Sequence, residues 1–323
     1  MPYSNEMYRN AEKIIKQRRD NAIMIAENRS EKIRKELPEI DEIQIQLSNI
    51  GMEVSRLFFC KDDVQSKVKE LKEKSTALIE KRSAILEKNG YNKNDMSPDF
   101  SCPVCEDRGF IGGRLCACHK ELLKELMKKE VSTFAPLEKC TFETFKTEYY
   151  STAPLNNSVI PRERAEKIYD ATMRYAQNFS KGSKNLIFLG ATGLGKTHLS
   201  LAIANVVINR GFSVCYGTSQ NICEDLRTEM FSFEAKPNYT KEKVLECDLL
   251  ILDDLGTEIE GKYSVAVIYN IINTRVLSGK PTIISTNYEW DELLDKYDQR
   301  ITSRLNGEYT VMQFFGTDLR NNK

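Results

Sequence analysis

One eight-residue segment constrains the fold of this 323-residue chain more than any other feature. Gly190–Thr197 reads Gly-Ala-Thr-Gly-Leu-Gly-Lys-Thr and fits the pattern G-x-x-x-x-G-K-[ST]. It follows the apolar run Asn185–Leu189 and opens a helical stretch toward Asn209, which Gly211 ends. Glycines here let backbone N–H groups turn toward phosphate oxygens, and the helix N-terminus adds its positive dipole end. The segment therefore predicts a phosphate-binding loop in an α/β domain.

The candidate nucleotide-binding residues are contiguous: Gly190, Ala191, Thr192, Gly193, Leu194, Gly195, Lys196, Thr197 and His198. Among them, Lys196 would reach the β- and γ-phosphates of ATP, and Thr197 would hold Mg²⁺. Further along, the apolar run Leu249–Leu252 ends in Asp253 and Asp254. The end of this predicted strand lies at the carboxyl edge of the sheet, where α/β proteins bind their ligands. Asp253 is the expected Mg²⁺-side acid, and Asp254 is the candidate for orienting an attacking water.

Short apolar runs alternate with helical stretches in the C-terminal half and predict a mainly parallel five-stranded sheet. The runs are Leu186–Leu189, Val214–Tyr216, Leu249–Leu252, Thr282–Ser285 and Val311–Phe314. Beyond the two acids, Asn287 ends one run and could sense the γ-phosphate, although such an Asn is more often a turn former. Arg300 and Arg304 share one helical face, either as solvated residues or as an arginine finger reaching a neighbouring subunit's nucleotide.

The first 90 residues contain almost no Gly or Pro and read as helix, with Pro38 ending the first helix near Leu37. Two apolar stripes with heptad-like spacing follow. They run through Ile40, Ile43, Leu47, Ile50, Val54 and Leu57, and through Val64, Val68, Leu71, Leu78 and Ile85. Joined near Cys60–Asp63, the stripes predict a helical hairpin or small bundle that packs on itself. Part of the seam could also bind a partner helix.

Four cysteines within 17 residues form the second recognisable motif: Cys102, Cys105, Cys116 and Cys118. Zinc takes four ligands tetrahedrally, and a C-x-x-C turn lets two thiolates chelate one ion. His119 follows directly and could replace Cys118. So short a module has no core of its own, so Zn²⁺ would supply much of its folding energy. An iron–sulfur cluster and redox chemistry are the alternatives, the latter without the βαβ setting it would need.

Composition and charge limit the classes of protein to which the chain can belong. The 47 Lys+Arg residues balance 47 Asp+Glu, so nucleic-acid binding would need a local basic patch. The N-terminus lacks the basic and apolar regions of a signal peptide, and no apolar run approaches the roughly 20 residues of a membrane span. We therefore expect a cytoplasmic protein without a membrane segment, its cysteines reduced.

Together these motifs resemble the DnaC/DnaI/IstB group of AAA+ ATPases, the bacterial and phage helicase loaders and their transposition relatives. The matching segments are Gly190–Thr197, Leu252–Glu258, Ser285–Asn287, Arg300–Leu305, Thr141–Phe145 with Tyr149 and Tyr150, and Phe315–Arg320. They cover about residues 140 to 320. The resemblance implies Asn287 as sensor 1, Arg304 as the arginine finger acting in trans, and Arg320 in a sensor 2-like place. Asp254 stands where many AAA+ proteins carry Glu, for which Glu258 could substitute.

The resemblance implies an AAA+ P-loop ATPase that loads the replicative hexameric DNA helicase onto single-stranded DNA at initiation or restart of replication. ATP, Mg²⁺ and Zn²⁺ would be its cofactors, and it would form a homo-oligomer in the ATP state. The alternatives are an IstB-like transposition helper ATPase and a nucleotide-stabilised adaptor with little turnover. The expected domains are a helical partner-binding domain at 1–99, a zinc module at 100–120, a linker and lead-in at 121–184, and the ATP-binding domain at 185–323.

Overall fold

The computed structural model describes residues 3–57, 64–155, 158–231, 239–259 and 261–322. The chain forms two compact units, Glu12–His119 and a second unit made of Met1–Ala11 with Lys120–Lys323. Within the described ranges, none of the helices is both long enough and apolar enough to cross a membrane.

The larger unit is built on a five-stranded, fully parallel sheet, as the apolar runs predicted. Its strands are β3 (Asn185–Leu189), β4 (Val214–Thr218), β5 (Leu249–Leu255), β6 (Thr282–Thr286) and β7 (Tyr309–Gln313), in the order β4-β5-β6-β3-β7. The last strand begins two residues before the apolar run that predicted it. The loop that follows β3 opens at the carboxyl edge of the sheet. Because β6 pairs directly with β3, this loop lies next to the end of β6.

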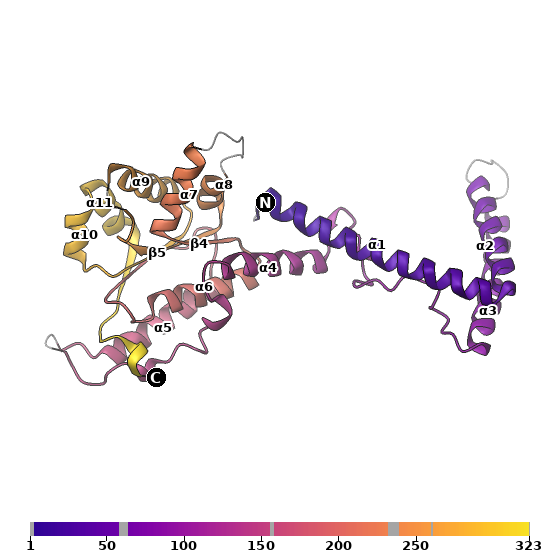
Figure 1. Ribbon diagram of the computed structural model, residues 1–323, viewed down its shortest axis with the longest axis horizontal. Helices are drawn as coiled ribbons and strands as arrows, with labels where there is room; N and C mark the ends of the chain where they lie inside the picture. Colours follow the sequence, from indigo (N-terminus) through magenta and orange to yellow (C-terminus); the bar gives the residue numbers. More distant parts are fainter. Residues whose placement is uncertain (1–2, 58–63, 156–157, 232–238, 260, 323) are drawn as a thin grey trace. The chain divides into compact units, whose positions relative to one another are not determined.

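Helices cover both faces of this sheet (Figure 1). On one side lie α5 (Pro161–Gln177) and α6 (Lys196–Asn209); on the other lie α7 (Ser219–Phe231), α8 (Tyr239–Glu246) and α9 (Lys262–Leu277). Alternate strand residues point to opposite faces. Accordingly Ile187, Leu250 and Ile284 join the core with α7 and α9. Two shorter helices, α10 (Trp290–Lys296) and α11 (Gln299–Glu308), then lead into β7.

Two helices lie wholly or largely in the stretch 121–184, which the sequence marked as a linker and lead-in. They are α4 (Ala117–Ser132) and α5, and the 3-10 turns Leu137–Lys139 and Thr147–Tyr149 lie between them. Phe142, Phe145 and Tyr150 of this stretch are buried. The Tyr150 hydroxyl donates to the Leu194 carbonyl at 2.6 Å, so this tyrosine is a packing residue.

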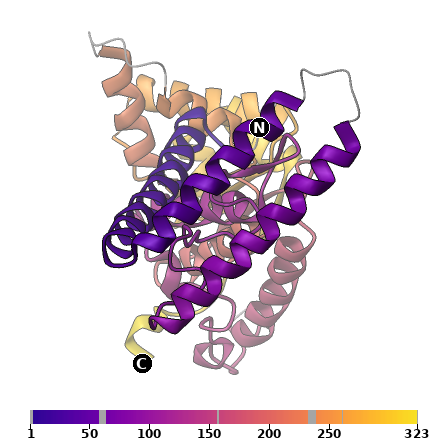
Figure 2. The ribbon, with the colours of Figure 1, turned by 90° about the vertical axis from the view of Figure 1, so that its right-hand side faces the viewer.

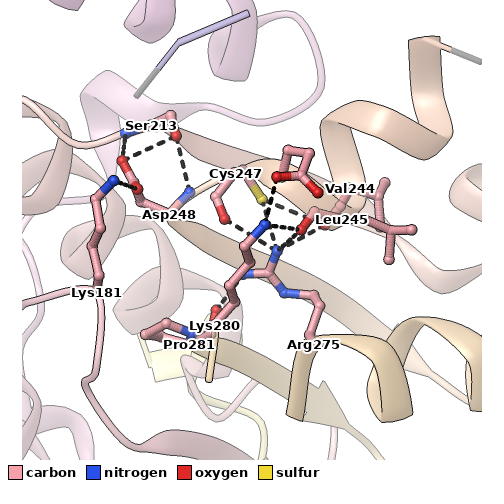
Figure 3. Close-up of polar contacts among 10 residues, drawn as sticks. Lys181, Ser213, Val244, Leu245, Cys247, Asp248, Arg275, Lys280 and Pro281 are labelled. Carbon is pink, nitrogen blue, oxygen red and sulfur yellow. Dashed lines mark hydrogen bonds and ion pairs between the residues drawn. The ribbon is translucent and has the colours of Figure 1, made fainter. Parts of the chain in front are cut away.

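A buried arginine connects the segments that enter two strands at the amino edge of the sheet (Figure 3). Arg275 of α9 is fully buried, and its guanidinium donates to the carbonyls of Val244 at 2.9 Å, Cys247 at 3.1 Å and Pro281 at 2.7 Å. These carbonyls belong to the segments that enter β5 and β6. The guanidinium therefore supplies donors to backbone groups that would otherwise be buried unpaired.

The N-terminal unit is helical, as expected. Its helices are α1 (Asn5–Glu36), whose first turns belong to the larger unit, α2 (Pro38–Leu57) and α3 (Val64–Lys88). Pro38 stands at the first position of α2, where its fixed φ suits a helix start. Helices α2 and α3 lie side by side (Figure 2), with Ile33, Ile40 and Leu86 at the centre of an apolar cluster. The expected connection at Cys60–Asp63 lies outside the described residues.

Candidate functional site

The phosphate-binding loop takes a backbone path that only glycine tolerates at two positions. Gly193 and Gly195 have φ values of 78° and 79°, in the left-handed region. A Cβ on Gly193 would lie 2.0 Å from Asp318 Oδ1, and one on Gly195 would lie 2.6 Å from the Phe145 ring. Side chains from the lead-in and from the C-terminal segment therefore close directly onto the loop.

Lys196 begins α6 and points back into the loop. It is 5% exposed, and its Nζ donates to the carbonyls of Gly190 at 2.6 Å and Ala191 at 2.7 Å, and to Asn287 Oδ1 at 2.8 Å. Burial lowers the pKa of its ammonium group to about 8. All three acceptors are uncharged oxygens, so phosphate oxygens would give this cation a stronger partner.

Asp253 at the end of β5 is held by hydroxyl groups from three elements. Its carboxylate is 2% exposed and accepts from Thr197 Oγ1 at 2.9 Å, from Tyr216 OH at 2.7 Å and from Ser285 Oγ. Threonine hydroxyl and carboxylate together form the pair that binds Mg²⁺ beside a P-loop. The geometry thus places Thr197 and Asp253 where one cation could contact both.

Asp254 follows in a strained conformation and faces the same cavity. Its φ is 51°, and its N–H donates to Ser285 Oγ at 3.1 Å. Burial, and next the neighbouring Asp253 carboxylate, raise the pKa of Asp254, while Lys196 and a hydrogen bond with Asn287 act in the opposite direction. Non-glycine residues with φ in this region are uncommon, and they cluster at functional sites.

A cavity of about 580 Å³ contains most of the expected nucleotide-site residues. It is lined by Thr192, Gly193, Gly195, Lys196, Thr197, His198, Asp254, Asn287 and Arg320, with Cys140, Phe145 and Tyr149 from the lead-in. His198 Nε2 lies 2.9 Å from the Thr141 carbonyl and so ties the lead-in to α6. Arg320 is exposed and makes a two-pronged ion pair with Asp318, which itself sits against Gly193.

The two arginines of α11 are placed differently from each other. Arg300 pairs with Asp298, the residue that caps α11, with Nη2 2.6 Å from Oδ2, and it stacks over the Tyr269 ring. Arg304 is half-buried, and its side chain forms no ion pair or hydrogen bond within the described ranges. It does not line the cavity. Of the pair, Arg304 is the one whose guanidinium has no partner within its own chain's described residues.

Sequence reasoning did not identify Tyr216, Ser285 or Asp318 as site residues. Ser285 stands two positions before Asn287, and Asp318 stands two positions before Arg320, both in segments already recognised. Tyr216 reaches the site from a distant part of the chain, which no local pattern reveals. Glu258, which could substitute for the catalytic acid, is buried at 5% exposed and does not line the cavity.

The four cysteines form a compact cluster in the N-terminal unit. Their sulfur atoms all lie within 4.8 Å of one another, with Cys102 Sγ 3.8 Å from Cys116 Sγ and Cys105 Sγ 3.5 Å from Cys118 Sγ. Thiolates bound tetrahedrally to one zinc ion stand about 3.8 Å apart, so this donor set fits Zn²⁺. A backbone N–H group of Cys105 is the main cause lowering the pKa of the Cys102 thiol to about 7, whereas burial is the main cause raising the pKa of the Cys118 thiol.

Neighbouring groups shape this cluster. The buried Asp107 carboxylate accepts from the backbone N–H groups of Ser101 at 2.8 Å and Cys102 at 2.9 Å. The hairpin of β1 (Phe110–Ile111) and β2 (Arg114–Leu115) joins the two cysteine pairs. His119 lies outside the cluster, with Nδ1 3.3 Å from the Gly109 carbonyl. The geometry therefore favours Cys118 over His119 as the fourth ligand.

Comparison with known proteins shows what part of the larger unit is similar to. A family model described as "IstB-like ATP binding protein" matches residues 170–307. The replicative helicase loader DnaC of Buchnera aphidicola subsp. Baizongia pistaciae is 31% identical over 162 residues, 49% of this chain and 65% of that protein. DnaC of Escherichia coli K12 is 25% identical over 56% of this chain and 69% of that protein. The chain thus spans about two thirds of the length of these relatives.

Among solved structures, a crystal structure of the DnaC helicase loader is 22% identical, with a TM-score of 0.47, covering 56% of this chain and 99% of that one. The family-model match covers the region that carries the phosphate-binding loop, Asp253 and Asn287. Residues 170–307 are therefore similar to IstB-like ATP-binding proteins, and the chain is similar to the DnaC helicase loaders over about half of its length.

Proposed function

We propose that the chain is an ATP-hydrolysing helicase loader that assembles with further copies of itself and delivers a replicative DNA helicase to single-stranded DNA. The observation that carries the proposal is the division of the site. Lys196, Asp254 and Asn287 line one cavity, whereas Arg304 lies outside it on α11. Similarity to DnaC, named a replicative helicase loader, supports the choice of partner.

Each side chain has a defined task in this proposal. Lys196 and Asn287 would contact the γ-phosphate, and Asp254 would orient the water that attacks it. Mg²⁺, held by Thr197 and Asp253, would neutralise charge on the phosphates. The water forms a bond to the γ-phosphorus as the bond to the β–γ bridging oxygen breaks, leaving ADP and phosphate.

We expect slow turnover, because the Asp254 side chain is one methylene shorter than the Glu that many AAA+ proteins carry at this place. A nucleotide-stabilised adaptor is the limiting case, and one measurement separates the two: single-turnover hydrolysis with enzyme in excess over ATP would release no phosphate from an adaptor.

Mixing two inactive variants tests the shared site. Arg304→Ala should bind ATP normally and lose about 10³-fold in kcat, the usual contribution of an arginine finger. Lys196→Ala should lose nucleotide binding but still offer its finger. Mixed together, the two variants should recover part of the activity, because one copy supplies the pocket and the other the arginine. Full activity in Arg304→Ala alone would show that the finger assignment is wrong.

The helical hairpin is the proposed helicase contact. Ile45, Met52 and Ile79 on α2 and α3 are 57%, 51% and 43% exposed. Exposed apolar side chains repeated along helices suit a partner helix. The test is co-migration of the full chain with the host's replicative helicase, followed by helicase loading onto circular single-stranded DNA. Loss of co-migration in Ile45→Glu and Ile79→Glu would support this surface.

A transposition helper is the second candidate, favoured by the IstB-like description of the matching model. Such a protein shares the nucleotide site but serves a transposase. The same co-migration experiment, repeated with the host's IS21-type transposase in place of the helicase, distinguishes the two functions. We also propose Zn²⁺ at Cys102, Cys105, Cys116 and Cys118, as the donor geometry supports.

A further inference from the structure

Glu258 is a buried carboxylate that the proposed reaction does not use. It lies in the loop after β5 and is 5% exposed, and no salt bridge joins it to a lysine or arginine of the described residues. A charge buried without a counter-ion is costly unless hydrogen bonds satisfy it. Its donors therefore indicate which parts of the fold it serves to hold together.

Three segments donate to this one carboxylate. Oε2 accepts from the Gly256 N–H at 2.9 Å and from Ser219 Oγ at 2.7 Å, and Oε1 accepts from the Tyr297 hydroxyl. Tyr297 is 4% exposed, and burial, followed by the hydrogen bond to Glu258, raises the pKa of its hydroxyl. The phenol therefore keeps its proton and acts as a donor at any physiological pH.

One end of this network reaches the nucleotide cavity. Ser219 Oγ lies 2.9 Å from the carbonyl of Asp254 as well as 2.7 Å from Glu258. Asp254 has a φ of 51°, so contacts around it must hold this backbone in place. A change in Asp254 when nucleotide enters the cavity would thus be felt at Ser219 and Glu258.

The other end reaches the arginine helix. Tyr297 directly precedes Asp298, whose side chain accepts from the N–H groups of Arg300 and Ile301 and so fixes the first turn of α11. Arg304 stands one turn further on the same helix. A helix moves largely as a rigid body, so the position of Tyr297 influences where Arg304 points.

We propose that Ser219, Glu258 and Tyr297 form a positioning link between Asp254 and α11, through which nucleotide in one copy sets Arg304 for the neighbouring copy. This inference rests on the proposed function, because it assumes that the cavity binds ATP and that Arg304 serves a second copy. The three residues touch no reacting atom. Their effect passes entirely through Asp254 and Arg304.

The test is hydrogen exchange on the full chain, diluted until it is monomeric, with and without Mg²⁺ and a non-hydrolysable ATP analogue. In wild type, the analogue should protect residues 190–199 and change exchange in residues 298–305 at least about fivefold, the lower end of ordinary coupling between sites. In Tyr297→Phe, protection of 190–199 should persist and the response of 298–305 should vanish. Steady-state turnover should show lower kcat with unchanged KM.

Two further variants guard the conclusion. Ser219→Ala breaks the link at its other end and should give the same loss, even if Tyr297→Phe proves too unstable to measure. Tyr175→Phe is the matched control, since its hydroxyl donates to the Lys184 carbonyl at 2.9 Å, away from this network. It should respond as wild type does.

The outcomes separate the link from the function beneath it. A wild-type chain whose residues 190–199 gain no protection refutes nucleotide binding itself. If those residues are protected but 298–305 do not respond, or if they respond equally in Tyr297→Phe and Ser219→Ala, the link is overturned. Loss of the response in Tyr175→Phe would also overturn it, because a general loss of rigidity would then explain the data.

Discussion

Nucleotide affinity should fall steeply above pH 8, because the lysine of the phosphate-binding loop is already losing its proton there. Burial lowers the pKa of Lys196 to about 8 in the nucleotide-free chain. Phosphate oxygens would restore it toward the ordinary value of about 10.5. Binding then requires uptake of a proton at high pH, and linkage gives a loss of affinity of about 20-fold between pH 7.5 and 9.5.

The apo chain should show the opposite trend in stability. A lysine whose pKa is depressed by folding binds fewer protons in the folded state than in the unfolded state between about pH 8 and 10.5. Its unfavourable contribution is present below pH 8 and is relieved as the pH rises through that window. Denaturant unfolding without nucleotide, repeated across this pH range, would measure this change in the free energy of unfolding.

The assay is a titration with a fluorescent ATP analogue from pH 7.5 to 9.5, in which the phosphates do not change charge. Lys196→Arg, whose guanidinium stays charged, should bind with little pH dependence. Cys140 lines the same cavity, and burial raises the pKa of its thiol, so Cys140→Ser should retain the wild-type profile. A flat wild-type profile, or an equal slope in Lys196→Arg, would refute the reasoning.

Three further predictions follow from contacts elsewhere in the chain. Arg275→Ala should lower the free energy of unfolding by about 3 kcal/mol or more, because buried carbonyls lose their donor; urea denaturation measures this, and a change below about 1 kcal/mol would contradict it. Tyr216→Phe should raise the Mg²⁺ concentration needed for half-maximal turnover about tenfold, because loss of a group supporting a metal ligand usually lowers metal affinity; an unchanged Mg²⁺ titration would exclude that role. A strong zinc chelator should raise hydrogen exchange in residues 100–120 while leaving the sheet protected, and unchanged exchange there after metal removal would count against structural zinc.

The sheet and the phosphate-binding loop could be predicted because their signals are local. An apolar run bounded by glycine and charge predicts a buried strand whatever lies around it, and the loop motif carries its own context. The same holds for the cysteine cluster, where ligand spacing within one short segment gave the geometry. The positions of strand ends were predicted less accurately, since β7 starts at Tyr309, before the apolar residues that indicated it.

The remaining site residues depend on contacts between distant segments. Tyr216 and Ser285 meet Asp253 from 37 and 32 residues away in sequence. Glu258 reads as a loop carboxylate, and only packing of α7 and the segment before α11 buries it. Residues 121–184 contain most of α4 and all of α5, and α5 packs against α6. Periodicity within a segment cannot report such convergence.

The junction between α11 and β7 has a consequence for how the protein tolerates change. Helix α11 ends at Glu308 and β7 begins at Tyr309, with no intervening residue. The strand then pairs with β3 along its whole length. An inserted residue here would either rotate the helix by about 100° or shift the strand so that its side chains exchange faces. The length of this junction should therefore accept no insertion, and a library of single-residue insertions would find a sharp minimum of survival at this point.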